Sequence, residues 1–116
     1  MDSKIFISVG SEVFTADFYD SDFTKSLLKQ FPMTVSMDDN EGYEYFAPLH
    51  NKVSGYSCDA KNIIPGDITL YNRISLSIFC NASLNSSDYV KIGHINNPAG
   101  LKKALNRNSS RVTFSV

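Results

Sequence analysis

Hydrophobic and polar residues alternate along much of the chain, and this alternation predicts strands. Residues 12–18 read EVFTADF, in which Val, Thr and Asp alternate with Phe, Ala and Phe. A period of two places successive side chains on opposite faces of a strand. Other segments rich in β-branched and aromatic residues are predicted as strands on the same grounds. They are residues 4–9, 33–37, 68–71, 74–80, 89–95 and 111–116, with a short aromatic segment at 43–46.

Two shorter segments show the spacing of an amphipathic helix. Asp20-Ser21-Asp22 offers an N-cap and acidic first-turn residues, and residues 23–31 then carry Phe and Leu at helical spacing. Pro32 ends this helix, because the residue before a proline avoids the helical region. The second helix is predicted to start at Asn97-Pro98, with residues 101–105 on its buried side.

Three segments lack the periodic spacing of hydrophobic residues and are predicted as loops. Residues 48–65 form a long irregular stretch, and a loop of that length in a compact domain is often functional. Residues 81–88 read as a polar loop, and residues 38–42 as an acidic turn. The acidic turn is not a calcium loop, because Tyr43 and Leu49 stand where such a loop needs glycine and glutamate.

About eight strands and two short helices predict a mainly β fold. Strands joined by hairpins give an antiparallel sheet that has to close or be covered. We therefore expect a closed, mostly antiparallel barrel with the two helices at its ends. The length of 116 residues suits a single domain spanning 1–116.

The charge balance and the absence of long apolar runs limit the partners and the location that we expect for this protein. The chain is 42% hydrophobic and 20% charged, with a net charge of −1, so it lacks the basic surplus expected of a protein that binds nucleic acid or a membrane surface. The basic run of Lys102 and Lys103 with Arg107 and Arg111 is placed at the end of a short helix, where cations complement the helix dipole. No apolar run approaches the ~18 residues of a membrane helix, and no secretory signal is present, which predicts a cytoplasmic protein.

The two cysteines and two histidines predict neither a metal site nor a cofactor. Cys58 and Cys80 are interpreted as reduced thiols, with a disulfide as the alternative. Neither cysteine has metal-ligand spacing with His50 or His94. His94 lies on a predicted strand and is expected to be half-buried and structural, whereas His50 lies in the irregular loop beside aromatic residues.

A groove lined by aromatic side chains is the candidate site. Tyrosines combine an apolar face with a hydroxyl that reaches water, so a subset near the irregular loop suits a small molecule or an extended peptide. The predicted aromatic lining consists of Tyr45, Phe46, Tyr71 and Phe79. The predicted polar contacts are Glu44, His50 and Arg73.

Four stretches together resemble a family of bacterial cyclophilin-like proteins whose function is not established. Residues 14–20 (FTADFYD) are similar to the family's F-x-A-x-L-Y-D, and residues 31–39 (FPMTVSMDD) to its L-P-L-T-x-x-M-x-D. Residues 64–71 (IPGDITLY) are similar to its G-D-I-x-L-Y, and residues 92–95 (IGHI) to its G-K-I. The resemblance covers nearly the whole chain and rests on the order and spacing of the motifs. It implies a cyclophilin-like β-barrel.

The resemblance also suggests an enzyme activity as an alternative to binding. Peptidyl-prolyl isomerisation needs an apolar slot for proline and a cation directed at the prolyl amide. True cyclophilins supply an arginine near aromatic residues, together with a tryptophan and a histidine. This chain has no tryptophan, and Arg73 is the weak candidate for the cation. A binding module is therefore preferred over an enzyme, with an accessory domain for protein interaction as a third hypothesis.

Overall fold

The computed structural model describes residues 3–40, 44–49, 51–53, 60–72, 74–81, 83–86, 89–107 and 111–116, with backbone alone at 40, 60–62, 83–86, 106 and 107. These residues form eleven strands and two short helices. The strands are β1 (Ser3–Val9), β2 (Glu12–Phe18), β3 (Met33–Ser36), β4 (Asp38–Asn40), β5 (Glu44–Pro48), β6 (Ala60–Ile63), β7 (Asp67–Tyr71), β8 (Ser75–Phe79), β9 (Ser83–Ser86), β10 (Tyr89–Ile95) and β11 (Arg111–Ser115). The helices are α1 (Asp22–Leu28) and α2 (Leu101–Arg107).

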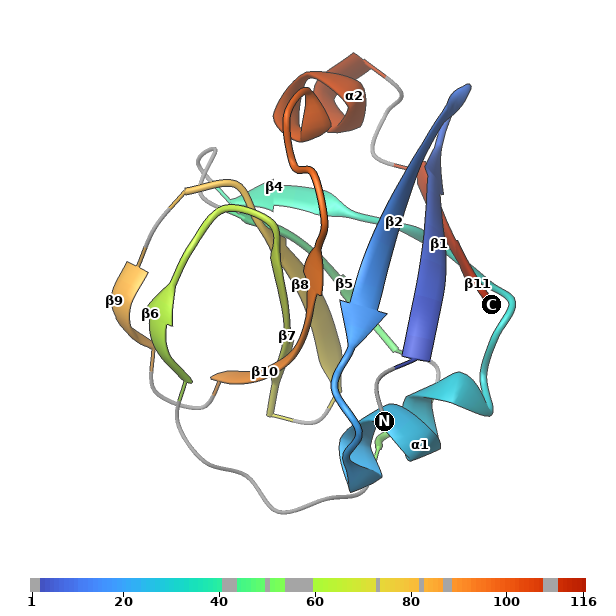
Figure 1. The fold of residues 1–116 in the computed structure, drawn as a ribbon, viewed down its shortest axis with the longest axis vertical. Coiled ribbons are helices and arrows are strands. Elements are labelled where there is room, and N and C mark those ends of the chain that lie inside the picture. The colour runs from blue at the N-terminus through green and yellow to red at the C-terminus, as the bar shows by residue number, and fades with distance from the viewer. Residues whose placement is uncertain are drawn as a thin grey trace.

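Nine of these strands form one antiparallel sheet that curls into a nearly closed barrel. Their order is β3-β11-β1-β2-β10-β7-β8-β5-β4. The two edge strands, β3 and β4, are separated in the chain by Met37 alone. Because consecutive Cα atoms lie about 3.8 Å apart, the sheet has to curl until its edges approach each other. The predicted mainly antiparallel barrel is therefore confirmed (Figure 1).

The two helices lie at opposite ends of the barrel in Figure 1. Helix α1 begins where the sequence predicts, because the Ser21 hydroxyl accepts a hydrogen bond from the Thr24 N–H at 3.2 Å. Its side chains Phe23 and Leu27 are buried. A single hydrophobic core fills the barrel and extends under both helices, with Leu101, Ala104 and Leu105 contributed by α2.

Helix α2 begins later than predicted. Residues 97–100 form a turn, in which the Asn97 side chain accepts a hydrogen bond from the Ala99 N–H at 3.3 Å. Gly100 has φ +80, a left-handed conformation that cannot serve as the first residue of an α-helix. The helix therefore starts at Leu101. Lys102 and Lys103 consequently lie in its first turn, so the prediction that they complement the C-terminal end of the helix dipole is wrong.

Three strands lie in segments predicted as loops. β4 occupies most of the acidic turn, and it pairs with β5 from Asp38 opposite Phe46 to Asn40 opposite Glu44. β6 lies within the predicted loop 48–65, and β9 lies within the predicted loop 81–88. β6 and β9 pair with each other as a separate two-stranded sheet. Their sequences, AKNI and SLNS, carry too few apolar residues to show the alternation of a half-buried strand.

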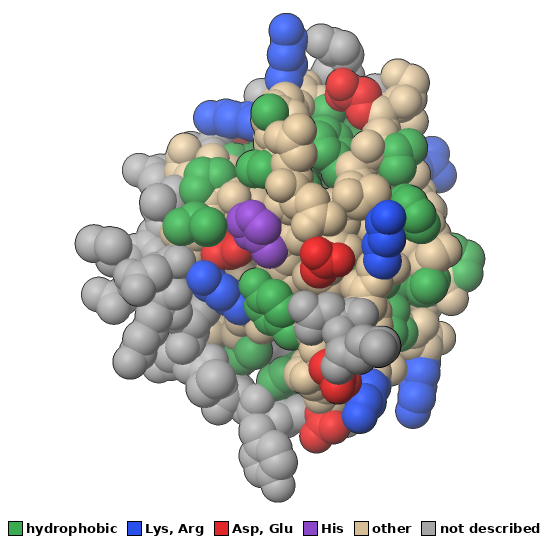
Figure 2. Space-filling view, in the orientation of Figure 1, with side chains coloured by type: hydrophobic (Ala, Val, Ile, Leu, Met, Phe, Trp, Pro, Cys, Tyr) green, Lys and Arg blue, Asp and Glu red, His purple; other side chains and the backbone are tan. Residues whose placement is uncertain are grey.

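Charges are mixed on the face of the molecule drawn in Figure 2. Basic and acidic side chains are interspersed there among hydrophobic ones, and they do not gather into a basic patch. No helix among the described residues is both long and apolar enough to cross a membrane. The absence of nucleic-acid and membrane partners stays a prediction from the composition.

Candidate binding site on the outer face of the barrel

The candidate site lies on the outer face of four neighbouring strands, β5, β8, β7 and β10. Successive residues point to opposite faces of a strand, so the register divides these strands into an inner set and an outer set. The inner set belongs to the hydrophobic core and includes Tyr45, Ala47, Ile68, Leu70, Leu76, Ile78, Val90 and Ile92. The outer set is polar or aromatic and includes Glu44, Phe46, Asp67, Thr69, Tyr71, Ser75, Ser77, Phe79, Tyr89 and Lys91.

A trough runs along the outer face of β8 because two of its outward residues are serines. Ser77 lies opposite Phe46 of β5, and Ser75 lies opposite Tyr71 of β7. Small side chains between rows of large ones leave a hollow, which we call the β8 trough. The cavity measures about 280 Å³. It is lined by Glu44, Phe46, Tyr71, Ser75, Ser77 and Tyr89.

Tyr89 closes one side of the β8 trough. Its phenol donates a hydrogen bond to Oε1 of Glu44, with 2.7 Å between the two oxygens. Since Tyr89 is on β10 and Glu44 is on β5, this contact spans the two strands between them. The Tyr89 ring lies 4.9 Å from the Tyr71 ring and 5.4 Å from the Phe79 ring, between centroids. This arrangement covers the carboxylate, so Glu44 is only 4% exposed.

The environment of Tyr89 keeps its phenol protonated. Burial raises the pKa of Tyr89 far above its ordinary value, and the hydrogen bond to Glu44 and the charges of Glu44 and Tyr71 raise it further. The phenol therefore remains a neutral hydrogen-bond donor throughout the physiological range.

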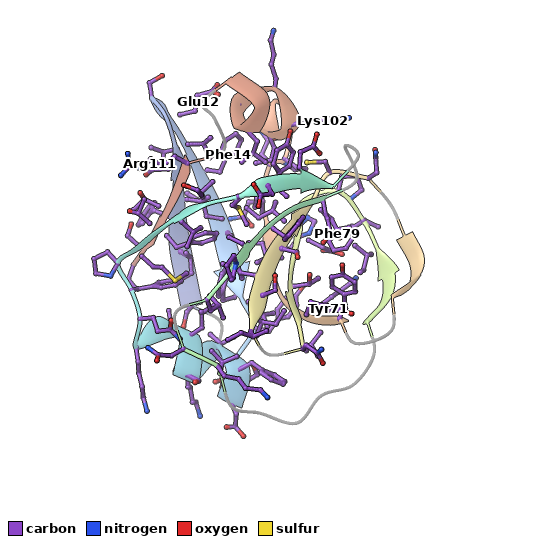
Figure 3. All side chains as sticks on the ribbon, turned by 180° about the vertical axis from the view of Figure 1, so that it is seen from behind. Glu12, Phe14, Tyr71, Phe79, Lys102 and Arg111 are labelled. Atoms are coloured by element: carbon purple, nitrogen blue, oxygen red, sulfur yellow. The ribbon has the colours of Figure 1, made fainter. Side chains whose placement is uncertain are left out.

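The β6–β9 pair lies beside this outer face. Ile63, the last residue of β6, packs with Phe79 and Tyr89 in a small hydrophobic cluster separate from the main core. Figure 3 shows the Tyr71 and Phe79 side chains on the side of the barrel where β6 and β9 lie, away from Glu12, Phe14 and Arg111. The cluster packs β6 against the barrel and contacts the ring of Tyr89.

A second cavity of about 450 Å³ lies between the β7–β8 end of the barrel and α2. Its lining is mostly apolar and includes Pro65, Phe79, Pro98 and Leu101, with the Cys80 thiol and the two lysines of α2 at its margin. Burial raises the pKa of Cys80 to about 11, although the nearby Lys102 opposes this rise. The thiol is therefore protonated at neutral pH and unsuited to nucleophilic catalysis.

A buried carboxylate fixes the only described histidine. Asp67 is 1% exposed and accepts a hydrogen bond from the Ile64 N–H at 2.9 Å. Its Oδ1 lies 2.7 Å from Nδ1 of His94, and its Oδ2 lies 3.0 Å from Nζ of Lys91. The His94 side chain is 31% exposed, which confirms the half-buried position predicted from the sequence. These contacts tie β7 to β10.

The structure brings part of the predicted site together. Glu44, Phe46 and Tyr71 line one cavity. Tyr45 does not, because it alternates with its neighbours and points into the core, where it is 1% exposed and burial raises its pKa. Phe79 lies on the outer face but borders the second cavity instead. His50 and Arg73 lie outside the described residues.

Sequence reasoning missed three residues of the lining, namely Ser75, Ser77 and Tyr89. The alternation in ISLSIF places the two serines on one face of the strand. Their importance depends on what flanks them, and that is set by pairing between strands far apart in the chain. Among the described side chains, no group of three or more His, Cys, Asp and Glu residues is arranged to hold a metal ion.

Comparison with known proteins bears on the fold and not on the ligand. Residues 7–116 match the model of a family described as the cyclophilin-like family. No curated protein matches the chain.

Proposed function

The chain belongs to the cyclophilin-like family, and we propose that within this fold it acts as a binding module whose β8 trough holds a small molecule or one side chain of an extended peptide. The observation that carries the proposal is the trough itself. Aromatic rings on β5, β7 and β10 flank two outward serines, and a buried carboxylate stands at one end.

The dimensions and chemistry of the β8 trough suit a compact ligand. Its volume of about 280 Å³ lies near the lower end for small-molecule sites. Phe46 and Tyr71 contribute aromatic rings to the lining, while Ser75 and Ser77 contribute hydroxyl groups. An apolar body with one or two polar groups therefore matches the lining better than a highly charged phosphate or nucleotide.

Prolyl isomerisation is less well supported by the described lining. The reaction needs a cation directed at the prolyl amide. The described lining residues of the trough include the carboxylate of Glu44 and neither lysine nor arginine. Lys91, on the same face, is engaged with Asp67 at 3.0 Å. Binding without catalysis is consequently the function that we favour, and a cytoplasmic location stays a prediction.

A titration followed by NMR tests the proposal. The probes are a short Ala-Pro peptide and four fragments, phenol, indole, pyrrolidine and tert-butanol. We expect at least one probe to shift the ring resonances of Phe46, Tyr71 and Tyr89 and the amide of Ser77. Exchange between the cis and trans forms of the Ala-Pro peptide should be unchanged by the protein. Acceleration that disappears in Arg73→Ala would instead establish an isomerase.

Two variants locate the binding. Tyr71→Leu removes one wall of the β8 trough at a residue that is 39% exposed, so the fold should tolerate it and binding should weaken several-fold. Phe6→Leu is the matched control, since Phe6 is 37% exposed on β1 and does not line the trough. Equal loss in both variants, or probe shifts confined to the second cavity, would refute binding at the trough.

A further inference from the structure

We propose that the second cavity is a further binding site, separate from the β8 trough, and that it takes a carboxylate carrying an apolar body. This cavity lies between the β7–β8 end of the barrel and α2 and measures about 450 Å³. That volume suits a small molecule, and it exceeds the volume of the β8 trough. Binding in this cavity does not depend on binding in the trough.

Backbone hydrogen bonds hold together the segments that form the walls of the second cavity. The Gly66 N–H donates to the Phe79 carbonyl at 2.8 Å, and the Ile95 N–H donates to the Gly66 carbonyl at 2.8 Å. Just before α2, the Leu101 N–H donates to the Pro98 carbonyl at 3.0 Å. These bonds fix the walls, so little ordering has to accompany the binding of a ligand.

The apolar part of the lining favours a ligand with an apolar body. Phe79 and Leu101 line the cavity and are themselves almost fully buried. Pro65 and Pro98 add two rigid rings that have no rotamer freedom to lose. An alkyl or phenyl group that enters the cavity is removed from water against these side chains, which is favourable.

Two lysines add positive charge to the same cavity. Lys102 and Lys103 both line it, and both are exposed. Within the described part of the chain, neither ammonium group has an ion pair or a hydrogen bond. The charge comes from these side chains and not from the backbone of α2, which has only seven residues. Both ammonium groups are therefore available to a negatively charged ligand.

The charge of Lys102 reaches the wall of the cavity. Figure 3 shows Lys102 at the α2 end of the barrel, on the same side of the molecule as Phe79. Burial raises the pKa of the Cys80 thiol to about 11, and Lys102 opposes this rise because it favours the negatively charged thiolate. Asp39 raises the same pKa, but its effect is smaller than that of Lys102, and it does not line the cavity. A negatively charged group on a ligand should be favoured by Lys102 in the same way.

A carboxylate fits this lining better than a phosphate group. The described lining contains no arginine, whose planar guanidinium binds phosphate through paired hydrogen bonds. Two lysines at the margin of an apolar cavity match a ligand with a single negative charge at one end. A small arylalkanoic or fatty acid has this chemistry, and so does a peptide C-terminus that follows an apolar residue.

Three probes with the same phenyl body isolate the effect of charge. They are phenylpropanoate, the neutral phenylpropanamide and the cationic phenylpropylamine, each titrated at neutral pH and low salt. Binding is followed by the NMR shifts of the Gly100 and Lys102 amides and the Leu101 methyl groups. We expect the carboxylate to bind about fivefold more tightly than the amide, and the cation to bind most weakly. Added salt should reduce the preference for the carboxylate.

A double variant tests the source of the preference. Lys102→Met with Lys103→Met removes both charges at exposed positions and keeps most of the length of the side chains, so the fold should tolerate it. The preference for the carboxylate over the amide should then fall to about twofold or less. Lys25→Met with Lys29→Met is the matched control, because it removes two exposed charges at the α1 end of the barrel and should keep the preference.

The outcomes separate this site from the β8 trough. Equal binding of the carboxylate and the amide, or a preference that survives in Lys102→Met with Lys103→Met, would overturn the proposal. The absence of shifts at Gly100, Leu101 and Lys102 would also overturn it. Shifts confined to Phe46 and Tyr71 would place the carboxylate in the β8 trough, so the second site would fail while the proposed binding function stands.

A peptide distinguishes the two sources of the carboxylate. Acetyl-Ala-Ala-Phe with a free C-terminus is compared with its C-terminal amide and with phenylpropanoate. Tighter binding of the free peptide than of phenylpropanoate would assign the site to the C-terminus of a peptide. Tighter binding of phenylpropanoate would assign it to a small carboxylic acid. If the peptide amide binds as tightly as the free peptide and phenylpropanamide as tightly as phenylpropanoate, the carboxylate has no role and the proposal is wrong.

Discussion

Tyr89 joins two strands that are not neighbours in the sheet, because its phenol on β10 reaches the Glu44 carboxylate on β5. The adjacent residues Glu44 and Tyr45 have different roles because their side chains point to opposite faces of β5. Both are almost fully buried, yet one lies on the outer face in the candidate site and the other in the core. A shift of one residue along the strand therefore moves a side chain from the outer face, where it could bind a ligand, to the core, where it packs.

Removing the Tyr89 hydroxyl should destabilise the protein. Tyr89→Phe leaves a buried carboxylate without this donor, which should lower the free energy of unfolding by about 1–3 kcal/mol. Urea denaturation at neutral pH measures the change. Tyr71→Phe is the matched control, because its ring is 39% exposed and its loss of a hydroxyl should change stability by no more than about 0.5 kcal/mol. Equal stability of Tyr89→Phe and the wild type would contradict a structural role for the Glu44 contact.

The raised pKa of Tyr89 predicts that the folded protein loses stability at alkaline pH. The pKa of Tyr89 is raised in the folded state, whereas an unfolded tyrosine titrates near pH 10. The folded state therefore holds the proton more tightly, and the resulting stability is present below about pH 10 and is lost as the pH rises above it. Denaturation series across this range should show a steep fall for the wild type.

The Tyr89→Phe variant should flatten that alkaline fall. Tyr45 and Cys80, whose pKa values are also raised by burial, remain in the variant and should preserve part of the slope. An unchanged slope in the variant would show that Tyr89 does not contribute to it.

At the scale of elements, β8 shows how far the sequence predicts the site. The alternation ISLSIF predicts the strand and places its serines on one face. It does not show that Phe46 and Tyr71 flank those serines, because both are brought there by pairing with β5 and β7. The sequence also predicts a strand at Tyr89, but the reach of this side chain across two strands depends on tertiary packing. The short polar strands β6 and β9 carry no periodic signal and were missed for that reason.

The close approach of β10 and β2 makes Gly93 a sensitive position. A Cβ added at Gly93 would lie 2.6 Å from Cδ1 of Phe18 and 2.7 Å from the carbonyl oxygen of Asp17. Because the second contact is with backbone, the strands would have to move apart. Gly93→Ala should therefore lower the free energy of unfolding by about 1–3 kcal/mol. Val13→Ala, at a residue that is 62% exposed on β2, should change it by no more than about 0.5 kcal/mol. Wild-type stability in Gly93→Ala would show that the two strands are farther apart.

The N-cap of α1 makes a local contribution to stability. Ser21→Ala removes the hydroxyl that accepts from the Thr24 N–H, and should cost about 1 kcal/mol in thermal or urea denaturation. Ser21→Asp should retain most of the stability, since aspartate also caps helices well. A loss of the same size in both variants would argue that the hydroxyl acts through another contact.

At the scale of the whole molecule, barrel closure decides which faces are available for function. The chain passes from β3 at one edge of the sheet to β4 at the other through Met37, so the inner faces of nine strands enclose the core. Polar and aromatic groups are consequently placed outside, where the β6–β9 pair lies beside them. The sequence predicts this architecture because the barrel follows from the number and order of the strands. The outer-face site depends on contacts between distant segments and could be predicted only in part.

Filling the β8 trough tests whether the ligand binds there. Ser75→Leu places a larger side chain on the trough floor and removes only a long hydrogen bond of 3.4 Å to the Ala47 carbonyl, so stability should stay within about 1 kcal/mol of the wild type. The measurement is the NMR titration of wild type and Ser75→Leu with phenol, indole, pyrrolidine and the Ala-Pro peptide. We expect shifts at Phe46, Tyr71 and Tyr89 in the wild type that disappear in the folded variant. Binding that persists unchanged in Ser75→Leu would contradict the placement of the site in the β8 trough.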